Sequence, residues 1–97
     1  MVGLGGVFAE VLSDVAYRVL PATTEDMKDM LRELRGYSVI AGYRGSWRDT
    51  QDSILDLLSR IARFMENHPE IEELDLNPVR ATDTGVLVLD SRAFLRD

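Results

Sequence analysis

The sequence predicts an α+β domain, a two-layer sandwich in which two helices cover one face of an antiparallel sheet in the order β-β-α-α-β-β. Two β-rich apolar runs open the chain, two stretches with helical periodicity follow, and a strand–turn–strand pattern closes it. A sheet with both helices on one face buries the apolar side of every element. With 97 residues and no repeat or linker, residues 1–97 are expected to form a single domain.

The first two strands are expected at residues 7–12 and 15–20, and each carries an ionisable residue that is a candidate for catalysis. Glu10 has almost only apolar neighbours, so it is either an edge carboxylate or points into a polar cleft shared with the last hairpin. Burial of this carboxylate without a partner would be costly. Arg18 could pair with Glu10 across the strands, or it could contact a phosphate group.

The first helix is expected to begin at Thr23, because Thr23 and Asp26 have the spacing of a capping box. Gly36 is placed to end this helix. Apolar residues recur between these points at i, i+3, i+4 and i+7, which is the period of one helix face. They are Met27, Met30, Leu31 and Leu34.

A second, longer helix is expected from Asp49 to about Asn67, just before Pro69. Its apolar residues keep the helical period throughout. They are Ile54, Leu57, Leu58, Ile61 and Met65. Arg44 precedes this helix in a glycine-flanked loop, where it could bind an anionic cofactor group or could simply be solvated.

The last hairpin carries the most informative pattern. Glu73, Asp75 and Asn77 alternate with leucines, so the three polar residues are expected on one face of a strand and the leucines in the core. The next strand ends at Asp90. A two-residue turn between Thr82 and Gly85 would place Asn77 directly opposite Asp90, whereas a bulge at Gly85 would shift the register by one.

Asp75, Asn77 and Asp90 are the candidate metal ligands, because carboxylate and amide oxygens on adjacent strands can hold Mg²⁺ and leave positions for phosphate oxygens. The other interpretation is a solvated acidic sheet face, and spacing alone favours it. The chain has no cysteine and a single histidine, His68, so a zinc site built on thiolates or histidines is excluded. Only oxygen-ligand metal chemistry is left.

Charge and hydropathy exclude other classes. The net charge of −6 argues against a nucleic-acid partner, which requires a basic surface. No apolar run reaches the roughly 20 residues needed to span a membrane, so no membrane association is expected. The amino-terminal residues lack the pattern of a signal peptide, and a cytoplasmic location is the default expectation.

Five segments, in order along nearly the whole chain, together resemble the ATP-grasp domain of NDP-forming acyl-CoA synthetases. This group includes ADP-forming acetyl-CoA synthetase and, more distantly, the β subunit of succinyl-CoA synthetase. The segments are Gly3-Leu4-Gly5-Gly6-Val7-Phe8-Ala9-Glu10-Val11, Tyr17-Arg18-Val19, Gly42-Tyr43-Arg44-Gly45, Glu73-Leu74-Asp75-Leu76-Asn77-Pro78 and Val88-Leu89-Asp90.

The resemblance implies the second, carboxy-terminal lobe of an ATP-grasp domain. Such enzymes convert acyl-CoA, ADP and phosphate into acid, CoA and ATP through acyl-phosphate and phosphohistidine intermediates. It also implies Mg²⁺ and ATP or ADP as cofactors, with Asp75, Asn77 and Asp90 facing the metal and the phosphates. Asp75 stands where many relatives have Glu, and Glu10 matches a recurrent acidic position.

The first ATP-grasp lobe, the CoA-binding domain and the domain that carries the phosphorylated histidine have no counterpart in the chain. His68 matches none of them. The chain is therefore expected to be a domain or subunit that is inactive alone, with the acyl substrate, the choice between ADP and GDP and the oligomeric state decided elsewhere. The alternative is a non-catalytic α+β interaction module whose acidic face is solvated or docks a basic partner.

Overall fold

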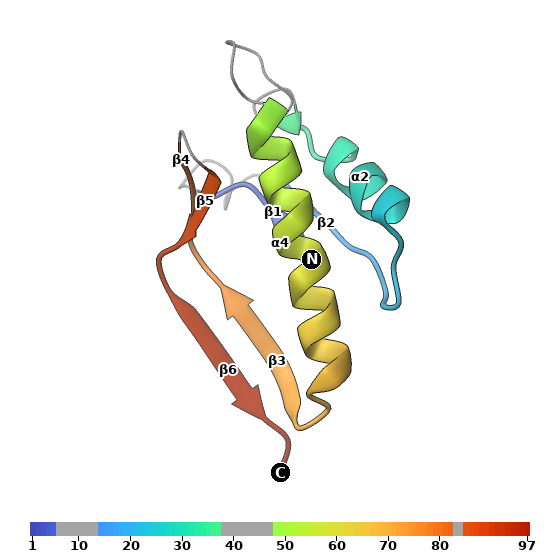
Figure 1. Cartoon of the computed structure of the whole chain (residues 1–97), viewed down its shortest axis with the longest axis vertical. Helices are drawn as coiled ribbons and strands as arrows, with labels where there is room; N and C mark the ends of the chain where they lie inside the picture. The colour runs from blue at the N-terminus through green and yellow to red at the C-terminus, as the bar shows by residue number, and fades with distance from the viewer. Residues whose placement is uncertain (6–13, 38–47, 83–84) are drawn as a thin grey trace.

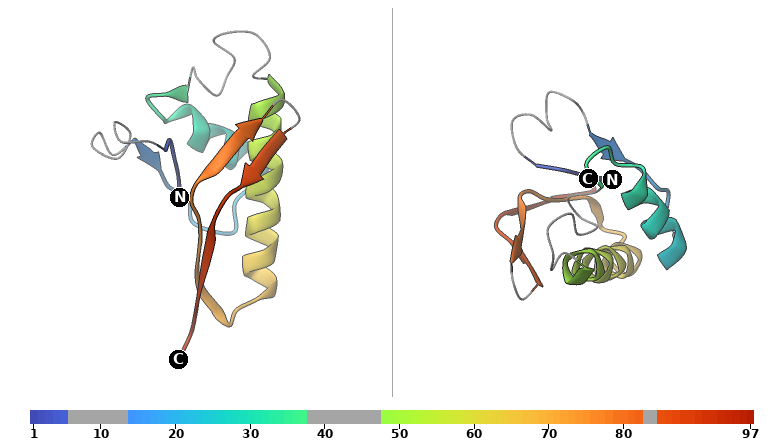
Figure 2. Two further views of the ribbon diagram at one scale, coloured as in Figure 1. Left: turned by 90° about the vertical axis from the view of Figure 1, so that its left-hand side faces the viewer. Right: turned by 90° about the horizontal axis from the view of Figure 1, so that it is seen from above.

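The computed structural model describes residues 1–5, 14–37, 48–82 and 85–97. In chain order its elements are β1 (Val2–Gly3), β2 (Val15–Ala16), α2 (Thr24–Arg32), α4 (Arg48–Asn67), β3 (Ile71–Leu76), β4 (Val79–Thr82), β5 (Gly85–Val88) and β6 (Ser91–Leu95). Each strand has one antiparallel partner: β1 pairs with β2, β3 with β6, and β4 with β5. The predicted α+β class is confirmed, and α4 lies between α2 and the carboxy-terminal strands (Figures 1 and 2).

The amino-terminal strand pair is short. Val2 lies opposite Ala16, and Gly3 lies opposite Val15. The strand expected at residues 7–12 lies outside the described residues. The expectation of a strand through residue 20 is wrong, because β2 ends at Ala16 and no described strand lies beside the residues that follow.

Helix α2 begins as the capping-box spacing predicts. The N–H of Asp26 donates to the Thr23 hydroxyl at 3.0 Å, and the N–H of Thr23 donates to the Asp26 carboxylate at 2.9 Å. These reciprocal bonds satisfy donors that have no partner within the helix. The pKa of Asp26 is lowered, first by the bond from the Thr23 backbone and then by the one from its hydroxyl, because both favour the charged carboxylate.

The end of α2 comes before Gly36, at Arg32. The carboxylate of Asp14 accepts from the backbone N–H groups of Arg35 at 2.8 Å and of Gly36 at 3.0 Å. Asp14 is only 9% exposed, and this bond pair ties the start of β2 to the end of α2. A Cβ added at Gly36 would overlap the Leu4 side chain, which would have to move to admit it.

Helix α4 runs from Arg48 to Asn67, one residue longer at its start than expected. Leu55 and Ala62 are buried in the core, and Leu58 packs against it. Leu57 lines a separate hollow of about 470 Å³ between α4 and β5, together with Val86. The apolar residues of α4 therefore face two parts of the structure: the core on one side and the carboxy-terminal strands on the other.

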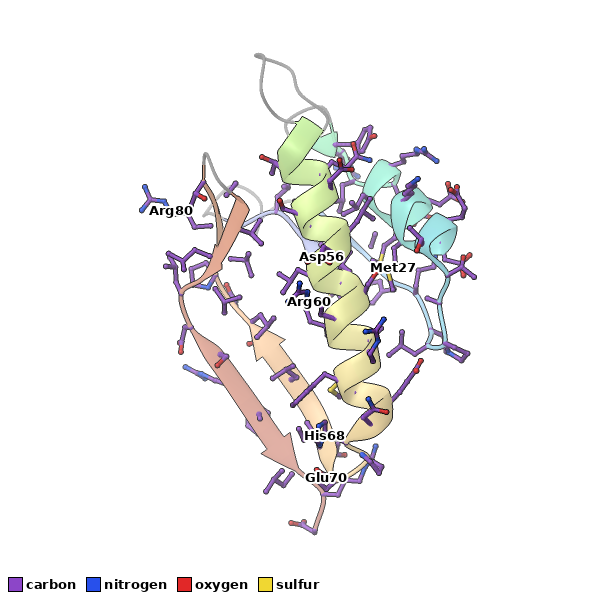
Figure 3. The ribbon with its side chains drawn as sticks, viewed as in Figure 1. Met27, Asp56, Arg60, His68, Glu70 and Arg80 are labelled. Atoms are coloured by element: carbon purple, nitrogen blue, oxygen red, sulfur yellow. The ribbon has the colours of Figure 1, made fainter. Side chains whose placement is uncertain are left out.

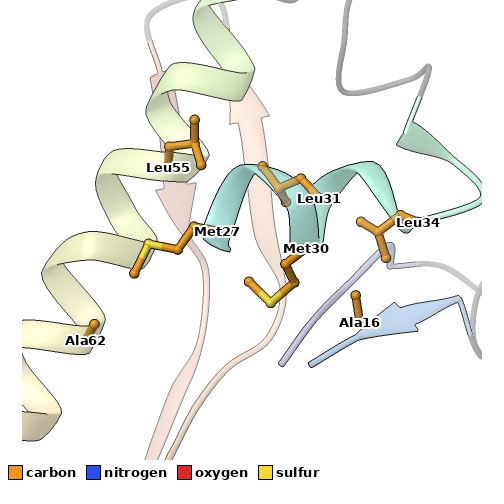
Figure 4. Close-up of a cluster of buried hydrophobic side chains, with 7 residues drawn as sticks. All are labelled: Ala16, Met27, Met30, Leu31, Leu34, Leu55 and Ala62. Carbon is orange, nitrogen blue, oxygen red and sulfur yellow. The ribbon is translucent and has the colours of Figure 1, made fainter. Parts of the chain in front are cut away.

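The buried core lies between the amino-terminal strands and the two helices (Figure 4). Its residues are Ala16, Met27, Met30, Leu31, Leu34, Leu55 and Ala62. All four apolar residues predicted for the first helix are among them, and Leu31 is 0% exposed. None of the described residues in β3 to β6 is fully buried, and apolar side chains such as Leu74 and Leu76 are half-buried there.

Candidate functional site

The strands β3 to β6 form one long hairpin, residues 71–95, that is interrupted in its middle. On one side of the interruption Leu76 lies opposite Ser91, and on the other side Val79 lies opposite Val88. Both pairs belong to the same register, so the residues between them also face each other. We call residues 77–78 and 89–90, which lie between the two strand pairs, the hairpin junction.

Asn77 lies directly opposite Asp90 at the hairpin junction. The N–H of Asn77 donates to the carbonyl oxygen of Asp90 at 3.1 Å, and the N–H of Leu89 donates to the carbonyl oxygen of Pro78 at 3.0 Å. At the far end Thr82 pairs with Gly85, the register of a two-residue connection. Of the two registers that the sequence allows, the structure has the one that brings Asn77 and Asp90 together.

The polar side chains follow the predicted alternation on β3. Glu73 and Asp75 are exposed, while Leu74 and Leu76 are half-buried. Asn77 and Asp90 are also exposed. Three oxygen-bearing side chains therefore stand on two adjacent chain segments, where opposite residues have Cβ atoms about 5 Å apart.

Among the described residues, the three side chains have few other partners. Asp90 Oδ1 accepts from the N–H of Ser91 at 2.9 Å, a bond that orients its carboxylate. Asp75 and Asn77 form no side-chain hydrogen bond or ion pair with another described residue. Carboxylate and amide oxygens suit Mg²⁺, which keeps several of its positions for water or phosphate oxygens.

The hairpin junction alone does not make a full set of protein ligands. Within residues 1–5, 14–37, 48–82 and 85–97, no three His, Asp or Glu side chains come together as a metal site. Two carboxylates and one amide fit a metal whose remaining ligands come from a nucleotide, from water or from another part of the protein. The donor set therefore fits half of a magnesium site.

A further charged residue at this face escaped the sequence reasoning. Arg92 lies directly opposite Asp75 in the β3–β6 register, so both side chains project from the same face of the hairpin. The sequence places Arg92 two residues after Asp90, but this spacing predicts a position beside the candidate ligands only when the strand register is known. Phe94 lies opposite Glu73 one step further along and is 50% exposed.

The other candidate residues lie elsewhere. Arg18 donates to the carboxylate of Glu33 at 2.7 Å and to the carbonyl oxygen of Tyr17 at 2.7 Å. The hydrogen bond to Glu33 raises the pKa of Arg18, since it stabilises the charged guanidinium. This contact links the chain after β2 to the end of α2, so Arg18 has a structural partner other than the expected Glu10. Glu10 and Arg44 lie outside the described residues.

His68 follows α4 and is half-buried. Its ring packs on Phe64 with a centroid distance of 4.4 Å, and its Nδ1 lies 3.1 Å from the carboxylate of Glu70. Figure 3 shows His68 and Glu70 together where α4 passes into β3, at the end of the hairpin remote from the hairpin junction. His68 therefore belongs to the helix end and not to the candidate site.

Comparison with known proteins identifies the class. The ATP-grasp domain family matches residues 1–95, so the chain belongs to this family. It is 42% identical over 95 residues to an ADP-forming acetate–CoA ligase I of Archaeoglobus fulgidus, covering 98% of the chain and 14% of that relative. It is 38% identical over 95 residues to the β subunit of the Pyrococcus furiosus enzyme I, covering 98% of the chain and 41% of the subunit.

Solved structures give the same result. The chain superposes on ACD1 of Ca. Korarchaeum cryptofilum in complex with coenzyme A with a TM-score of 0.84 and 41% identity, over 97% of the chain and 42% of that structure. A second structure, an acetyl-coenzyme A synthetase 1 of the same organism with coenzyme A and Mg-AMPPCP, matches with a TM-score of 0.84 over 44% of its length. The chain thus spans less than half of these relatives.

No helix in the described residues is long and apolar enough to cross a membrane.

Proposed function

We propose that this chain is the nucleotide-phosphate-binding lobe, the carboxy-terminal one, of an ADP-forming acyl-CoA synthetase. The observation that carries the proposal is the pairing of Asn77 with Asp90 at the hairpin junction, with Asp75 exposed two residues before Asn77. The relatives are named as ADP-forming acetate–CoA ligases, and one related structure contains Mg-AMPPCP. The reaction assigned to the complete enzyme converts acyl-CoA, ADP and phosphate into acid, CoA and ATP.

In this proposal the chain contributes positioning. Asp75, Asn77 and Asp90 would hold a magnesium ion with their side-chain oxygens, and the backbone bond between Asn77 and Asp90 fixes the separation of two of these residues. A bound magnesium ion would neutralise the negative charge that develops on phosphate oxygens during phosphoryl transfer. Groups that are held in place before the reaction stabilise that charge without reorganisation in the transition state.

The chain is proposed to be inactive alone. It covers 41% of the β subunit of the Pyrococcus furiosus enzyme I, and its only histidine, His68, packs on Phe64 at the end of α4. The other ATP-grasp lobe, the CoA site and the phosphohistidine step of the proposed reaction are therefore assigned to other domains, supplied in cis or in trans. These domains are also expected to supply the remaining surface of the nucleotide site.

Titration of the ¹⁵N-labelled chain with Mg²⁺, with and without ATP, tests the proposal by NMR. Shifts that centre on Asp75, Asn77 and Asp90 and that grow when ATP is added are expected. Asp29→Asn is a matched control, because Asp29 is an exposed acid on α2 that pairs with Arg32 and belongs to no part of the hairpin. This variant should respond to Mg²⁺ and ATP as the unmodified chain does.

The assembled enzyme provides the second test. Asn77→Ala and Asp90→Ala should each remove most acyl-CoA synthetase activity while the circular dichroism spectrum and the thermal midpoint stay close to those of the unmodified enzyme. Full activity in both variants would refute the metal assignment. A non-catalytic interaction module would instead show no metal-dependent shifts and would bind a basic partner through Glu73 and Asp75.

A further inference from the structure

We propose that Arg92 binds phosphate oxygens at the candidate site. One face of the hairpin then binds both the metal ion and the phosphate groups of a metal–phosphate ligand. The inference rests on the proposed function and adds an anion-binding residue to it. In the hairpin register Arg92 lies opposite Asp75, and the next pair on the same face is Asn77 with Asp90. Successive pairs on one face of a hairpin lie about 7 Å apart.

Arg92 is available to an external anion. Arg18, Arg32 and Arg60 are bonded to carboxylates of described residues, at 2.7, 2.9 and 2.9 Å. The guanidinium of Arg92, in contrast, donates to no other described residue, although Asp75 stands directly across the hairpin from it. The guanidinium and the carboxylate are thus neighbours in the described structure without forming an ion pair.

This arrangement suits a ligand that is itself both positive and negative. A metal ion takes carboxylate and amide oxygens, while the phosphate groups attached to it take a guanidinium, whose planar fork can donate two hydrogen bonds to phosphate oxygens. A cation alone would be opposed by Arg92, and an anion alone would be opposed by Asp75 and Asp90. A nucleoside diphosphate with bound metal satisfies both kinds of side chain at once.

Arg80 offers a control on the same hairpin. It lies on β4 opposite Leu87, which is 54% exposed, and its guanidinium donates to no other described residue. Figure 3 shows Arg80 at the outer edge of the hairpin, directed away from α4. Arg80→Gln and Arg92→Gln therefore remove the same charge from two exposed positions of one hairpin, of which only Arg92 lies opposite a candidate oxygen ligand.

The experiment uses the 97-residue chain and two probes, Mn²⁺ alone and Mn²⁺ with ADP, and follows the relaxation of the amide signals of residues 75, 77 and 90. Arg92→Gln should bind Mn²⁺ alone at least as well as the unmodified chain, since a nearby positive charge is removed. It should bind Mn-ADP roughly ten- to a hundredfold more weakly, the loss expected for charge-assisted hydrogen bonds. Arg92→Lys should recover part of the affinity, because it keeps the charge but not the fork.

The outcomes separate the two proposals. If Arg92→Gln and Arg80→Gln bind Mn-ADP equally well, the role of Arg92 is wrong while the proposed function stands. If the unmodified chain shows no metal-dependent relaxation at residues 77 and 90, the proposed function fails and the inference fails with it. If Arg92→Gln displaces hairpin signals throughout residues 71–95 without any ligand, Arg92 is a structural partner of Asp75, and this too overturns the inference.

Discussion

The backbone N–H of Asn77 donates to the carbonyl oxygen of Asp90 at 3.1 Å, and this bond sets two candidate ligands face to face across the hairpin junction. The same register continues to the closed end of the hairpin, where Thr82 pairs with Gly85. Because a shift of one residue at that end would move every pair along the hairpin, the site depends on how the connection is made.

Gly85→Ala should therefore disturb both stability and the site. Gly85 has a φ of +146°, which side-chain-bearing residues rarely adopt, while an added Cβ would meet Ser53 Oγ only at an ordinary 3.7 Å. The cost thus comes from the backbone, and we expect a loss of more than about 1 kcal/mol in the free energy of unfolding. Cross-strand NOEs between residues 77 and 90 should weaken. Gly5→Ala, with no atom of the described residues within 4 Å of the added Cβ, should leave both measurements unchanged.

Leu31→Ala should destabilise the chain strongly. Leu31 is 0% exposed at the centre of the core, so its truncation removes buried apolar surface and leaves a cavity. The expected loss is about 2–5 kcal/mol in urea unfolding. Leu87→Ala provides the comparison, since Leu87 is 54% exposed and its truncation should change stability by less than about 1 kcal/mol. Equal losses in the two variants would contradict the described position of the core.

Asp14→Ala should separate β2 from the end of α2. The substitution leaves the partly buried N–H groups of Arg35 and Gly36 without their acceptor, at a cost of about 1–3 kcal/mol. The amides of residues 35 and 36 should also exchange with solvent faster in hydrogen-exchange measurements. Asp29→Ala removes an exposed ion pair with Arg32 and should cost less than about 1 kcal/mol. Unchanged exchange at both amides in Asp14→Ala would argue against the contact.

The capping box of α2 should make part of the chain's stability depend on pH. The pKa of Asp26 is lower in the folded chain than in the unfolded one, so its contribution to stability is present above the unfolded value and is lost as the pH falls through the folded value. Thr23→Ala removes the hydroxyl bond but keeps the backbone bond, and should raise the pKa of Asp26 part of the way back. Carboxyl ¹³C titration of Asp26 measures this directly. An unaltered titration in Thr23→Ala would assign the whole effect to the backbone.

Local patterns predicted the helices well. Thr23 with Asp26 marked the start of α2, and the four apolar residues spaced for one face are all buried. The end of α2 was not predictable, because the amides that follow the helix bond to Asp14, which lies 21 residues before Arg35 in the chain. A buried carboxylate that binds distant backbone amides leaves no periodic signal in the sequence.

The candidate site was predictable only in part. The alternation of polar and apolar residues on β3 predicts that Asp75 and Asn77 share a face, but two registers remained possible until the pairing of Thr82 with Gly85 was known. Strand β6 was not predicted, because Ser91–Leu95 lacks a regular alternation of apolar and polar residues. Arg92 was not named from the sequence, since its position opposite Asp75 exists only in the paired hairpin.

The buried apolar residues of the described chain all come from β2, α4 and the region of α2, and none comes from the hairpin that bears the candidate site. Natural selection can therefore act on the two parts separately. Substitutions at the exposed positions of residues 71–95 can alter ligand preference while the folding core stays as it is. Among related sequences, side chains that surround the hairpin junction can diversify at little cost to the domain's ability to fold.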